Sequence, residues 1–458
     1  MYYTQQEIAE IKEYAQKHIC PHYANNIDLN KNQKVYVRSD DVYVYDIEGK
    51  AYLDTFGSLL TTICGHNNKK IIDAMFKQIN VLDFFPNFGD HYCLPMIELS
   101  KKLEKLMPGN LTAYFYVNSG SEANETALKI ARSYHLQRGE PERVKIVSRY
   151  GSYHGTTLGV TAATGLSYFT EHYQPMIPDY YIKAVGANCS HCHLGLKKDT
   201  CLMDCFTALQ KAIEDNDPKT ISALIMDPIP GSNTGYPIPP EGYMKKVREL
   251  CDKYGIILIF DEIQTGIGKS GYMFASEYLG VTPDIMTLSK AITNGYIPLG
   301  VVAMRQDIYD LFRSAPGREL RSGSTFGGHN VACAAAIACL DYIEEYKLLD
   351  NVKVISNYIK ERVAKLMDEY SIIAAIHGVG LLLAIELAAD RKDLTPLNPE
   401  YKVGNFINEY CYEHGLIMRN NGDIIVIAPP LTFKKEHVDI MMNTFENALK
   451  EAIKKFNL

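Results

Sequence analysis

The sequence has no long apolar run, no tryptophan, no internal repeat and no low-complexity linker. A helix that crosses a bilayer needs about 20 apolar residues, so no transmembrane segment is predicted. The net charge of -7 and the lack of a concentrated stripe of Lys and Arg argue against a nucleic acid or an anionic membrane as partner. What is present, 47% hydrophobic and 22% charged residues, is typical of a globular enzyme.

We expect no secretory signal, because the amino terminus has the pattern of a charged helix. Thr4 and Glu7 form a capping-box pattern, which predicts an amphipathic helix to about His18. The cysteines number 11, an odd count in a long chain without a signal, and this suits a reducing cytosol better than a disulfide framework. We therefore expect a cytoplasmic protein.

Length and periodicity together predict an α/β fold with more than one domain. The 458 residues exceed the size at which one hydrophobic core keeps growing. Helical stretches such as 241–254, which Gly255 ends, alternate with strand-like runs. These runs begin near Tyr114 and Val144 and cover 222–226, 256–260, 284–288 and 300–304. Such alternation predicts a mostly parallel sheet with helices on both faces.

Two charged residues close two of these strand-like runs. Asp261 ends the apolar run 256–260, which reads as a buried parallel strand that brings the carboxylate to the sheet edge where ligands bind. Lys290 ends the next apolar stretch, and a lysine desolvated near that edge becomes a nucleophile. A Schiff-base lysine and an anion beside a pyridinium nitrogen are what pyridoxal phosphate requires. The alternative is a strand-capping aspartate and a solvated loop lysine.

The surrounding residues resemble the signature of the class III, or omega, aminotransferases. The matching residues are Asp261-Glu262-Ile263-Gln264-Thr265-Gly266, Gly271, Glu277, Pro283-Asp284 and Ser289-Lys290. The resemblance implies that Lys290 binds pyridoxal phosphate and that Asp261 keeps its ring nitrogen protonated. It further implies that Ile263 presses on one face of the ring and that Gln264 hydrogen-bonds the 3-oxygen of the ring.

A turn between a strand-like run and a helix supplies a phosphate site. Free N–H groups and the helix dipole point at the turn Asn118-Ser119-Gly120-Ser121-Glu122, so an anion is expected there. The alternative is an ordinary helix cap, with Ser119 or Ser121 as the capping residue. The turn resembles the family's phosphate-binding turn, which implies Gly120 and Ser121 as phosphate ligands.

Two further motifs carry the same resemblance. Ser152-Tyr153-His154-Gly155 follows the run 144–148, and the family's tyrosine stacks on the cofactor ring, which implies that role for Tyr153 and contact with the substrate. Thr325, in 324–330, matches a threonine that reaches the phosphate of the neighbouring subunit. The resemblance therefore implies a homodimer with Thr325 acting in trans. Packing for Tyr153 and helix capping for Thr325 are the alternatives.

The resemblance also sets the expected fold. It implies a fold-type I pyridoxal-phosphate transferase with a large cofactor-binding domain over residues 70–325. The N-terminal segment 1–69 and the C-terminal part 326–458 are expected to form a smaller α+β domain.

Two other motifs compete with this interpretation. Gly266-Ile267-Gly268-Lys269-Ser270 ends like a nucleotide-binding Walker A loop, but Ile263 stands where the first glycine is required, so that reading fails on spacing. A second cluster combines Cys189, Cys192, Cys201 and Cys205 with His191 and His193. Paired thiolates are a zinc pattern. Since the second pair is loosely spaced, we expect a reduced surface loop without metal.

The predicted reaction moves an amino group from an omega-amino acid or related amine to a 2-oxo acid, pyruvate or 2-oxoglutarate. A Schiff base on Lys290 carries the transfer, and the same amine shuttles the proton. A racemase, epimerase or decarboxylase that uses the same cofactor is the runner-up. A nucleoside triphosphatase and a zinc-dependent interaction module are the alternatives outside this cofactor class.

The substrate site has three sequence indications. Arg419, in a stretch that resembles the family's mobile-arginine segment, matches a substrate carboxylate. Leu59 and Leu60 stand where some relatives carry tryptophan, so we expect a wide pocket with Leu60 at the substrate. Asp227 stands where the family has glutamate and leaves a buried acid one methylene short.

Overall fold

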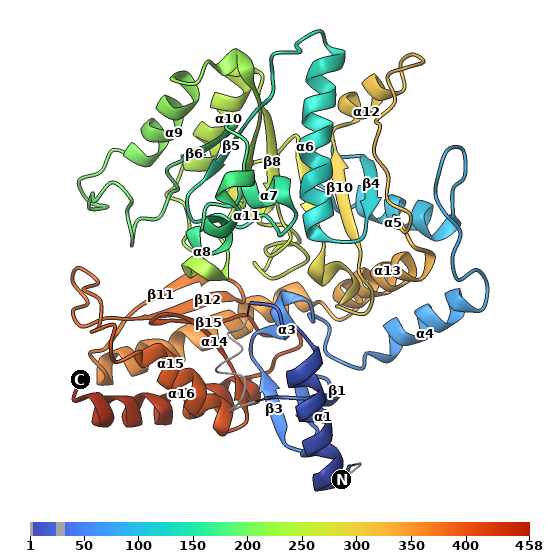
Figure 1. Ribbon diagram of the computed structural model, residues 1–458. Helices are drawn as coiled ribbons and strands as arrows, with labels where there is room; N and C mark the ends of the chain where they lie inside the picture. The colour runs from blue at the N-terminus through green and yellow to red at the C-terminus, as the bar shows by residue number, and fades with distance from the viewer. Residues whose placement is uncertain (1–2, 24–32) are drawn as a thin grey trace.

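The computed structural model describes residues 3–23 and 33–458 and places a seven-stranded sheet at the centre of the fold (Figure 1). Within these residues the strand order is β4-β10-β9-β8-β7-β5-β6. The strands are β4 Ala113–Val117, β5 Lys145–Arg149, β6 Tyr181–Ala184, β7 Ile221–Met226, β8 Ile257–Asp261, β9 Ile285–Leu288 and β10 Gly300–Met304. Strands β6, β5, β7, β8 and β9 are parallel, and β10 is antiparallel to both β9 and β4. The predicted fold class, a mostly parallel sheet, is confirmed.

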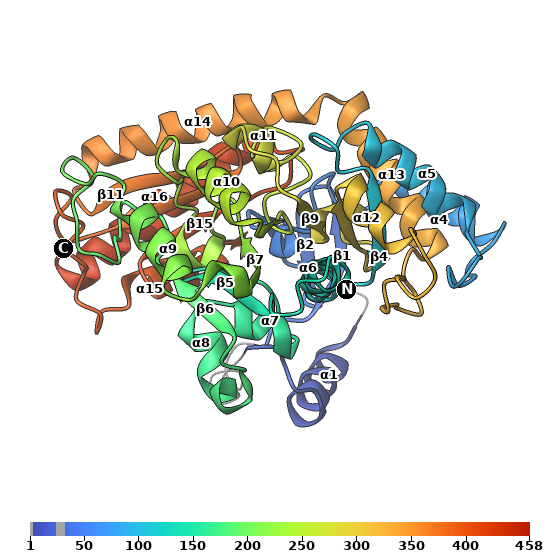
Figure 2. The ribbon, with the colours of Figure 1, turned by 90° about the horizontal axis from the view of Figure 1, so that it is seen from above.

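Helices cover both faces of this sheet because its buried strands are apolar on both sides. In β8, Ile257 and Ile259 pack into one core and Leu258 and Phe260 into another, as the alternation of strand side chains requires. The first core contains α6 Gly120–Gln137, α7 Leu158–Ala163 and α12 Gln306–Phe312, and the second contains α9 Asp204–Glu214 and α10 Tyr243–Tyr254. Figure 2 shows α6 and α7 on the opposite side of the strands from α10.

A second sheet is built from the C-terminal part of the chain. Its antiparallel strands are β11 Ile373–Val379, β12 Leu382–Leu387, β15 Ile424–Ile427 and β14 Arg419–Asn421, in that order. The helices α14 Leu348–Glu369, α15 Val403–Glu413 and α16 Lys435–Phe456 share its core (Figures 1 and 2). This body carries Arg419 at the end that faces the central sheet.

The N-terminal and C-terminal segments meet in a third sheet. Strands β1 Tyr36–Asp40, β2 Tyr43–Asp46 and β3 Ala51–Asp54 are antiparallel, and β13 Leu416–Ile417 lies parallel to β3. The predicted N-terminal helix is confirmed as α1 Gln5–His18, with Thr4 and Glu7 in a capping box. The division of the chain into residues 1–69, 70–325 and 326–458 stays a prediction.

The other helices connect these bodies. They are α3 Gly57–Leu60, α4 Lys69–Ile79, α5 Leu94–Glu104, α8 Ser167–Thr170, α11 Ala275–Leu279 and α13 Asn330–Glu345, with short 3-10 turns that include Ser232–Thr234 and Lys290–Thr293. Within the described ranges, no helix is both long and apolar enough to cross a membrane.

Candidate active site

Seven of the predicted site residues line one small cavity at the carboxyl ends of the central strands. The cavity measures about 180 Å³. Its predicted lining residues are Gly120, Ser121, Tyr153, Asp261, Ile263, Gln264 and Lys290, and Ser119, His154, Gly155, Thr156 and Ser289 complete the described lining. The motifs that lie far apart in the sequence therefore meet where the strands end, as the parallel topology requires.

Asp261 is fixed at the end of β8 by three donors. Its Oδ2 accepts hydrogen bonds from Asn124 Nδ2 at 2.7 Å and from His154 Nδ1 at 2.9 Å. Its Oδ1 accepts one from the backbone N–H of Ile263 at 3.0 Å. Because a carboxylate only accepts, the proton of His154 stands on Nδ1. The side chain is 5% exposed, and its three donors fix the orientation of the carboxylate at the edge of the cavity.

Asn124 and His154 are functional residues that the sequence reasoning did not assign. His154 stands beside the assigned Tyr153, and Asn124 lies three residues after the assigned Ser121. Asn124 Oδ1 in turn accepts from Thr287 Oγ1 at 2.7 Å, which fixes the orientation of the amide. The signal for both was their nearness to assigned residues, but nothing local in the sequence shows that the two side chains converge on one carboxylate.

Lys290 follows β9 and points a free amine into the cavity. Its φ is 42°, a left-handed conformation that costs energy for a non-glycine residue and occurs at functional sites. The side chain is partly buried, and its amine makes no hydrogen bond to any residue that the structure describes. Burial lowers the pKa of Lys290 to about 8; nearby Asp261 opposes this shift, and Arg419 adds to it. A lysine in this state is available as a nucleophile near neutral pH.

The phosphate turn is both a helix cap and a closely packed cradle. Ser119 is the N-cap of α6, since its side chain accepts from the N–H of Glu122 at 3.2 Å, so the capping alternative is correct for Ser119. Ser121 Oγ accepts from the N–H of Thr156 at 3.1 Å. A Cβ on Gly120 would lie 2.8 Å from Ile263 Cδ1, and one on Gly155 would lie 2.5 Å from Ser121 Oγ. Both positions therefore need glycine to keep the cavity open at the helix N-terminus.

A larger cavity adjoins the small one and contains the predicted substrate residues. It measures about 900 Å³ and is lined by Leu59, Leu60 and Arg419, and it shares Tyr153, Gln264 and Lys290 with the small cavity. Arg419, in β14, donates from Nη2 to Asn233 Oδ1 at 2.7 Å. The structure thus brings Arg419 and Lys290 to the same space, although they come from different sheets.

One wall of the large cavity is a strained turn. Ser58, Leu59 and Leu60 all have positive φ, at 47°, 63° and 65°, which is unfavourable for residues with a side chain. Asp54 holds the turn, because its carboxylate accepts from the N–H of Ser58 at 2.6 Å and from Ser58 Oγ at 2.8 Å. The turn places Leu60 in the wall and leaves Leu59 exposed.

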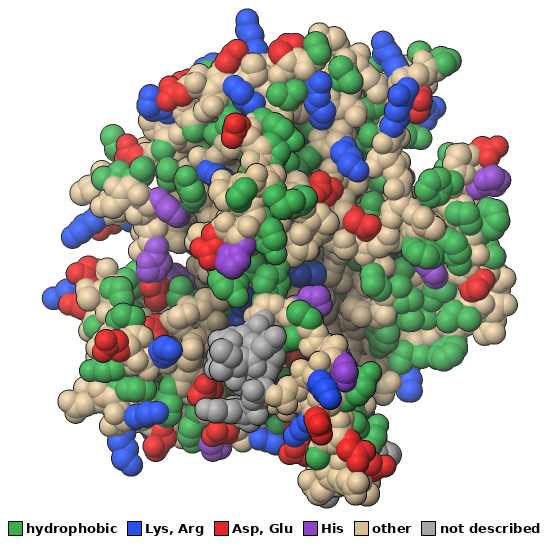
Figure 3. All heavy atoms as spheres, in the orientation of Figure 1, with side chains coloured by type: hydrophobic (Ala, Val, Ile, Leu, Met, Phe, Trp, Pro, Cys, Tyr) green, Lys and Arg blue, Asp and Glu red, His purple; other side chains and the backbone are tan. Residues whose placement is uncertain are grey.

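Thr325 lies outside the small cavity of its own chain. It is exposed, in the loop before α13, and is not among the described residues that line the cavity. Phe326 next to it lies 5.2 Å, between ring centroids, from Phe84. Figure 3 shows hydrophobic side chains gathered over α4 and α5. The exposed ones include Phe76, Ile79, Val81, Leu82, Phe85, Phe88, Tyr92, Leu94 and Ile97.

Asp227 is buried and paired. Its Oδ1 accepts from Arg149 Nη2 at 2.9 Å and from Ser152 Oγ at 2.6 Å. Asp227 Oδ2 and the Nε and Nη1 atoms of Arg149 have no hydrogen-bond partner among the described residues. The short acid therefore satisfies the buried arginine only in part, and through Ser152 it supports the loop that carries Tyr153.

No residue of either competing motif lines the two cavities at the strand ends. Lys269, in the Walker-like loop, donates to the backbone oxygens of Ala428 at 2.8 Å and Pro429 at 2.5 Å, so it points into the protein. The four cysteines of the loop are free thiols, and no group of three His, Cys, Asp or Glu side chains in the described part of the chain is placed to hold a metal ion. His191 of this loop binds Glu386 at 2.6 Å instead.

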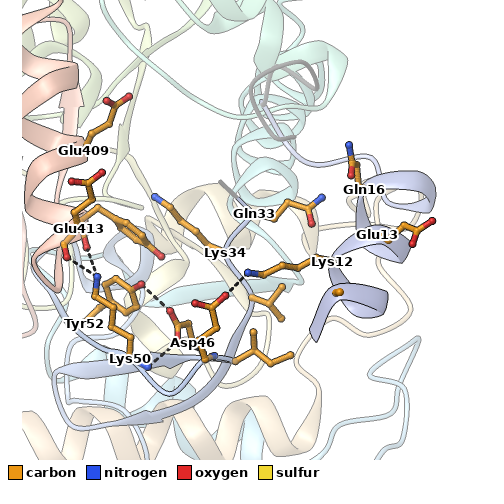
Figure 4. Close-up of a pocket in the computed structure, with 15 residues that line it drawn as sticks. Lys12, Glu13, Gln16, Gln33, Lys34, Asp46, Lys50, Tyr52, Glu409 and Glu413 are labelled. Carbon is orange, nitrogen blue, oxygen red and sulfur yellow. Dashed lines mark hydrogen bonds and ion pairs between the residues drawn. The ribbon is translucent and has the colours of Figure 1, made fainter. Parts of the chain in front are cut away.

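A third cavity, of about 540 Å³, lies between α1 and α15 and is lined with charged residues (Figure 4). Lys12 pairs with Glu48 at 2.5 Å, and Lys50 donates to the backbone oxygen of Glu413 at 2.7 Å. Tyr52 donates to Asp46 at 2.8 Å. None of the predicted site residues lines this cavity, so we assign the chemistry to the two cavities at the strand ends.

Comparison with known proteins gives a consistent result. The sequence pattern of the family described as "Aminotransferase class-III" matches residues 26–449. Gamma aminobutyrate transaminase 1, mitochondrial, of Solanum lycopersicum is 32% identical over 91% of this chain and 81% of its own. Putrescine–pyruvate aminotransferase of Pseudomonas aeruginosa is 30% identical over 98% of this chain and 97% of its own. The crystal structure of the omega transaminase from Pseudomonas jessenii in complex with PMP is 29% identical, has a TM-score of 0.92, and aligns over 97% of this chain and 98% of its own.

Proposed function

The chain belongs to the class-III aminotransferase family, which depends on pyridoxal phosphate, and on that basis we propose that it moves an amino group from an omega-amino acid or related terminal amine to a 2-oxo acid such as pyruvate or 2-oxoglutarate. The observation that carries the substrate class is that Lys290 and Arg419 line one cavity of about 900 Å³. An amine at one end of a substrate and a carboxylate at the other match these two groups.

The residues of the small cavity fit the cofactor. Gly120 and Ser121, at the N-terminus of the long helix α6, are suited to its phosphate, and the missing Cβ atoms of Gly120 and Gly155 leave the room for it. Asp261, held by three donors, is suited to face the ring nitrogen. Tyr153 and Ile263 are suited to contact the ring, and Gln264 to bond its 3-oxygen. When bound, the cofactor supplies an electron-withdrawing ring that stabilises negative charge at the substrate carbon.

The chain's own residues then divide the work of the reaction. Asp261 keeps a proton on the ring nitrogen, because its carboxylate cannot turn away from its three donors. Lys290 would hold the cofactor covalently, and its Nζ, when free, would carry a proton to and from the substrate carbon. Its pKa of about 8 lets the amine exchange protons near neutral pH. Arg419 orients the substrate through its carboxylate, at the far end from Lys290.

Replacing Arg419 tests the substrate class. We expect Arg419→Ala to raise the apparent KM for the oxo acid and for an omega-amino acid by about tenfold or more, since one charge-assisted pair contributes about 1.5–3 kcal/mol. Arg419→Lys is the matched control, because it keeps the charge but loses the bidentate geometry. Its KM values should fall between those of the parent and those of Arg419→Ala. Initial rates of alanine formation from pyruvate measure both. An unchanged KM for every carboxylate substrate would remove Arg419 from the site.

The same assay separates the runner-up activities. A racemase or epimerase leaves the oxo acid untouched, and a decarboxylase releases carbon dioxide, whereas an aminotransferase forms one amino acid from each oxo acid that it consumes. Stoichiometric appearance of alanine is the expected result.

We also propose a homodimer in which Thr325 of each chain completes the phosphate site of the other. Its support is the exposed position of Thr325 outside its own cavity and the apolar surface over α4 and α5 (Figure 3). Such a surface is large for a monomer and typical of an interface. Light scattering of the purified protein tests the assembly, and a monomer that retains the cofactor fully would contradict it.

A further inference from the structure

Arg419 is supported in the large cavity by neutral groups only. Its Nη2 donates to Asn233 Oδ1 at 2.7 Å and more weakly to Asn421 Oδ1 at 3.4 Å. Its guanidinium carbon lies 5.3 Å from the ring centroid of Phe56. Among the residues that the structure describes, no carboxylate comes within ion-pair distance of Arg419, whereas the other buried arginine near the site, Arg149, is paired with Asp227. The charge of Arg419 is therefore uncompensated.

The position of Asn233 is fixed by a contact between its turn and β14. Asn233 lies in the 3-10 turn Ser232–Thr234 that follows β7, and this turn is tied to β14 because Asn421 Nδ2 donates to the backbone oxygen of Ser232 at 2.5 Å. A guanidinium has donors only, so the amide of Asn233 must turn its oxygen towards Arg419. The contact joins the central sheet to the C-terminal sheet across the cavity, 186 positions apart in the chain.

The rest of the described cavity lining offers no carboxylate to pair with a second cation. Its described lining has two basic residues, Lys290 and Arg419, and no Asp or Glu. Burial lowers the pKa of Arg419, which shows that its charge is only partly solvated. A substrate carboxylate would relieve this uncompensated charge, whereas a second ammonium group in the same place would be repelled by it.

We propose that Asn233 is a positioning residue that holds Arg419 with a neutral acceptor, and that this neutrality selects amine donors that carry a carboxylate over diamines. The proposal rests on the proposed function, because it takes Arg419 as the group that meets the substrate's carboxylate. A carboxylate at position 233 would hold the guanidinium in the same place but neutralise it. Comparing Asn with Asp at position 233 therefore separates the effect of holding the guanidinium in place from the effect of its net charge.

The test compares Asn233→Asp with Asn405→Asp. Asn405 lines the same cavity, but its Oδ1 accepts from Asn420 at 2.7 Å and makes no bond to Arg419, so it controls for a charge added to the cavity. We expect Asn233→Asp to raise the apparent KM for the oxo acid and for an omega-amino acid by about tenfold or more, with kcat at saturation within about threefold. For a diamine such as 1,4-diaminobutane, kcat/KM should stay level or rise. Asn405→Asp should change each KM by less than about threefold.

Two further variants test whether the effect at position 233 acts through Arg419. Asn233→Ala removes the acceptor without adding charge and should raise KM for the acids by a smaller factor, without favouring the diamine. In an Arg419→Ala background, Asn233→Ala should have no further effect on KM, because the two residues act as a unit. Circular dichroism and the absorbance of the bound cofactor confirm that each variant is folded.

The possible failures are distinguishable. If Arg419→Ala leaves every KM unchanged, the proposed substrate class itself is wrong. If Arg419→Ala raises KM but Asn233→Asp behaves like Asn405→Asp, only the role of Asn233 is overturned. The same holds if Asn233→Ala keeps its effect in the Arg419→Ala background.

Discussion

Lys269 and Lys290 are both withdrawn from water, and both have a lowered pKa, yet the fold uses them differently. Burial lowers the pKa of Lys269 to about 7 and that of Lys290 to about 8. Lys269 is 0% exposed, and its amine is bonded to two backbone oxygens. Lys290 is only partly buried, lines both cavities at the strand ends, and makes no hydrogen bond to a described residue. A lowered pKa therefore indicates burial for both lysines. A free amine that faces a cavity distinguishes Lys290 as the nucleophile.

The acids near the two lysines differ in the same way. Asp54, the anion that acts on Lys269, has its oxygens occupied by the backbone and hydroxyl of the turn at Ser58, so it serves the wall of the large cavity. Asp261, the anion that acts on Lys290, is fixed by its donors at the edge of the small cavity. The Asp54–Lys269 pair supports the structure, and the Asp261–Lys290 pair is placed for a ligand.

The largest expected effect is the loss of Lys290. We expect Lys290→Ala to lower turnover by at least about 1,000-fold while the fold is kept, because Lys290 is the one lysine among the described residues that line the small cavity. The measurement is the transaminase rate of the purified variant, with circular dichroism as the control for folding. Substantial remaining activity would show that Lys290 is not the nucleophile.

The next effect concerns the stability of the Lys269 region. In the unfolded chain a lysine titrates near about pH 10.4, whereas the folded pKa of Lys269 is about 7. Charging Lys269 therefore destabilises the fold. This destabilisation is full below about pH 7 and disappears as the pH rises towards 10.4. Relative to Lys269→Met, which cannot titrate, the parent chain should therefore gain about 3 kcal/mol between about pH 7 and about pH 9.5. Urea unfolding of both cofactor-free proteins measures this difference, and a difference that does not vary with pH would contradict it.

The smallest effect is that of Lys269→Met on catalysis. Its amine serves the backbone oxygens of Ala428 and Pro429, so we expect turnover to stay within about threefold of the parent and stability at high pH to fall by about 1–3 kcal/mol. Kinetics and unfolding of the same preparation measure both quantities. Loss of turnover as complete as in Lys290→Ala would mean that the two lysines had been assigned the wrong way round.

The sequence could predict those parts of the site that depend on local pattern. A buried strand that ends in Asp261, a lysine after the next strand and a glycine turn before α6 each follow from residues close together in the chain, and parallel topology then brings them to one edge. The same argument predicted the central sheet and the N-terminal helix.

The remaining features depend on side chains that meet across the fold. Nothing near Lys269 shows that its amine turns inward to Ala428, and nothing near Arg419 shows that Asn233 is its support. The pairing of Asp227 with Arg149 and the convergence of Asn124 and His154 on Asp261 are likewise contacts between distant segments. Periodicity fixes which face of an element is buried, but it does not fix which polar groups share that face.

We infer that the free amine of Lys290, and not the more deeply buried amine of Lys269, bonds to the cofactor. The direct measurement is borohydride reduction of the protein loaded with pyridoxal phosphate, followed by peptide mapping by mass spectrometry. We expect one reduced pyridoxyl group per chain on the peptide that contains Lys290, and an unmodified Lys269. A pyridoxyl group on Lys269, or on any lysine other than Lys290, would contradict it.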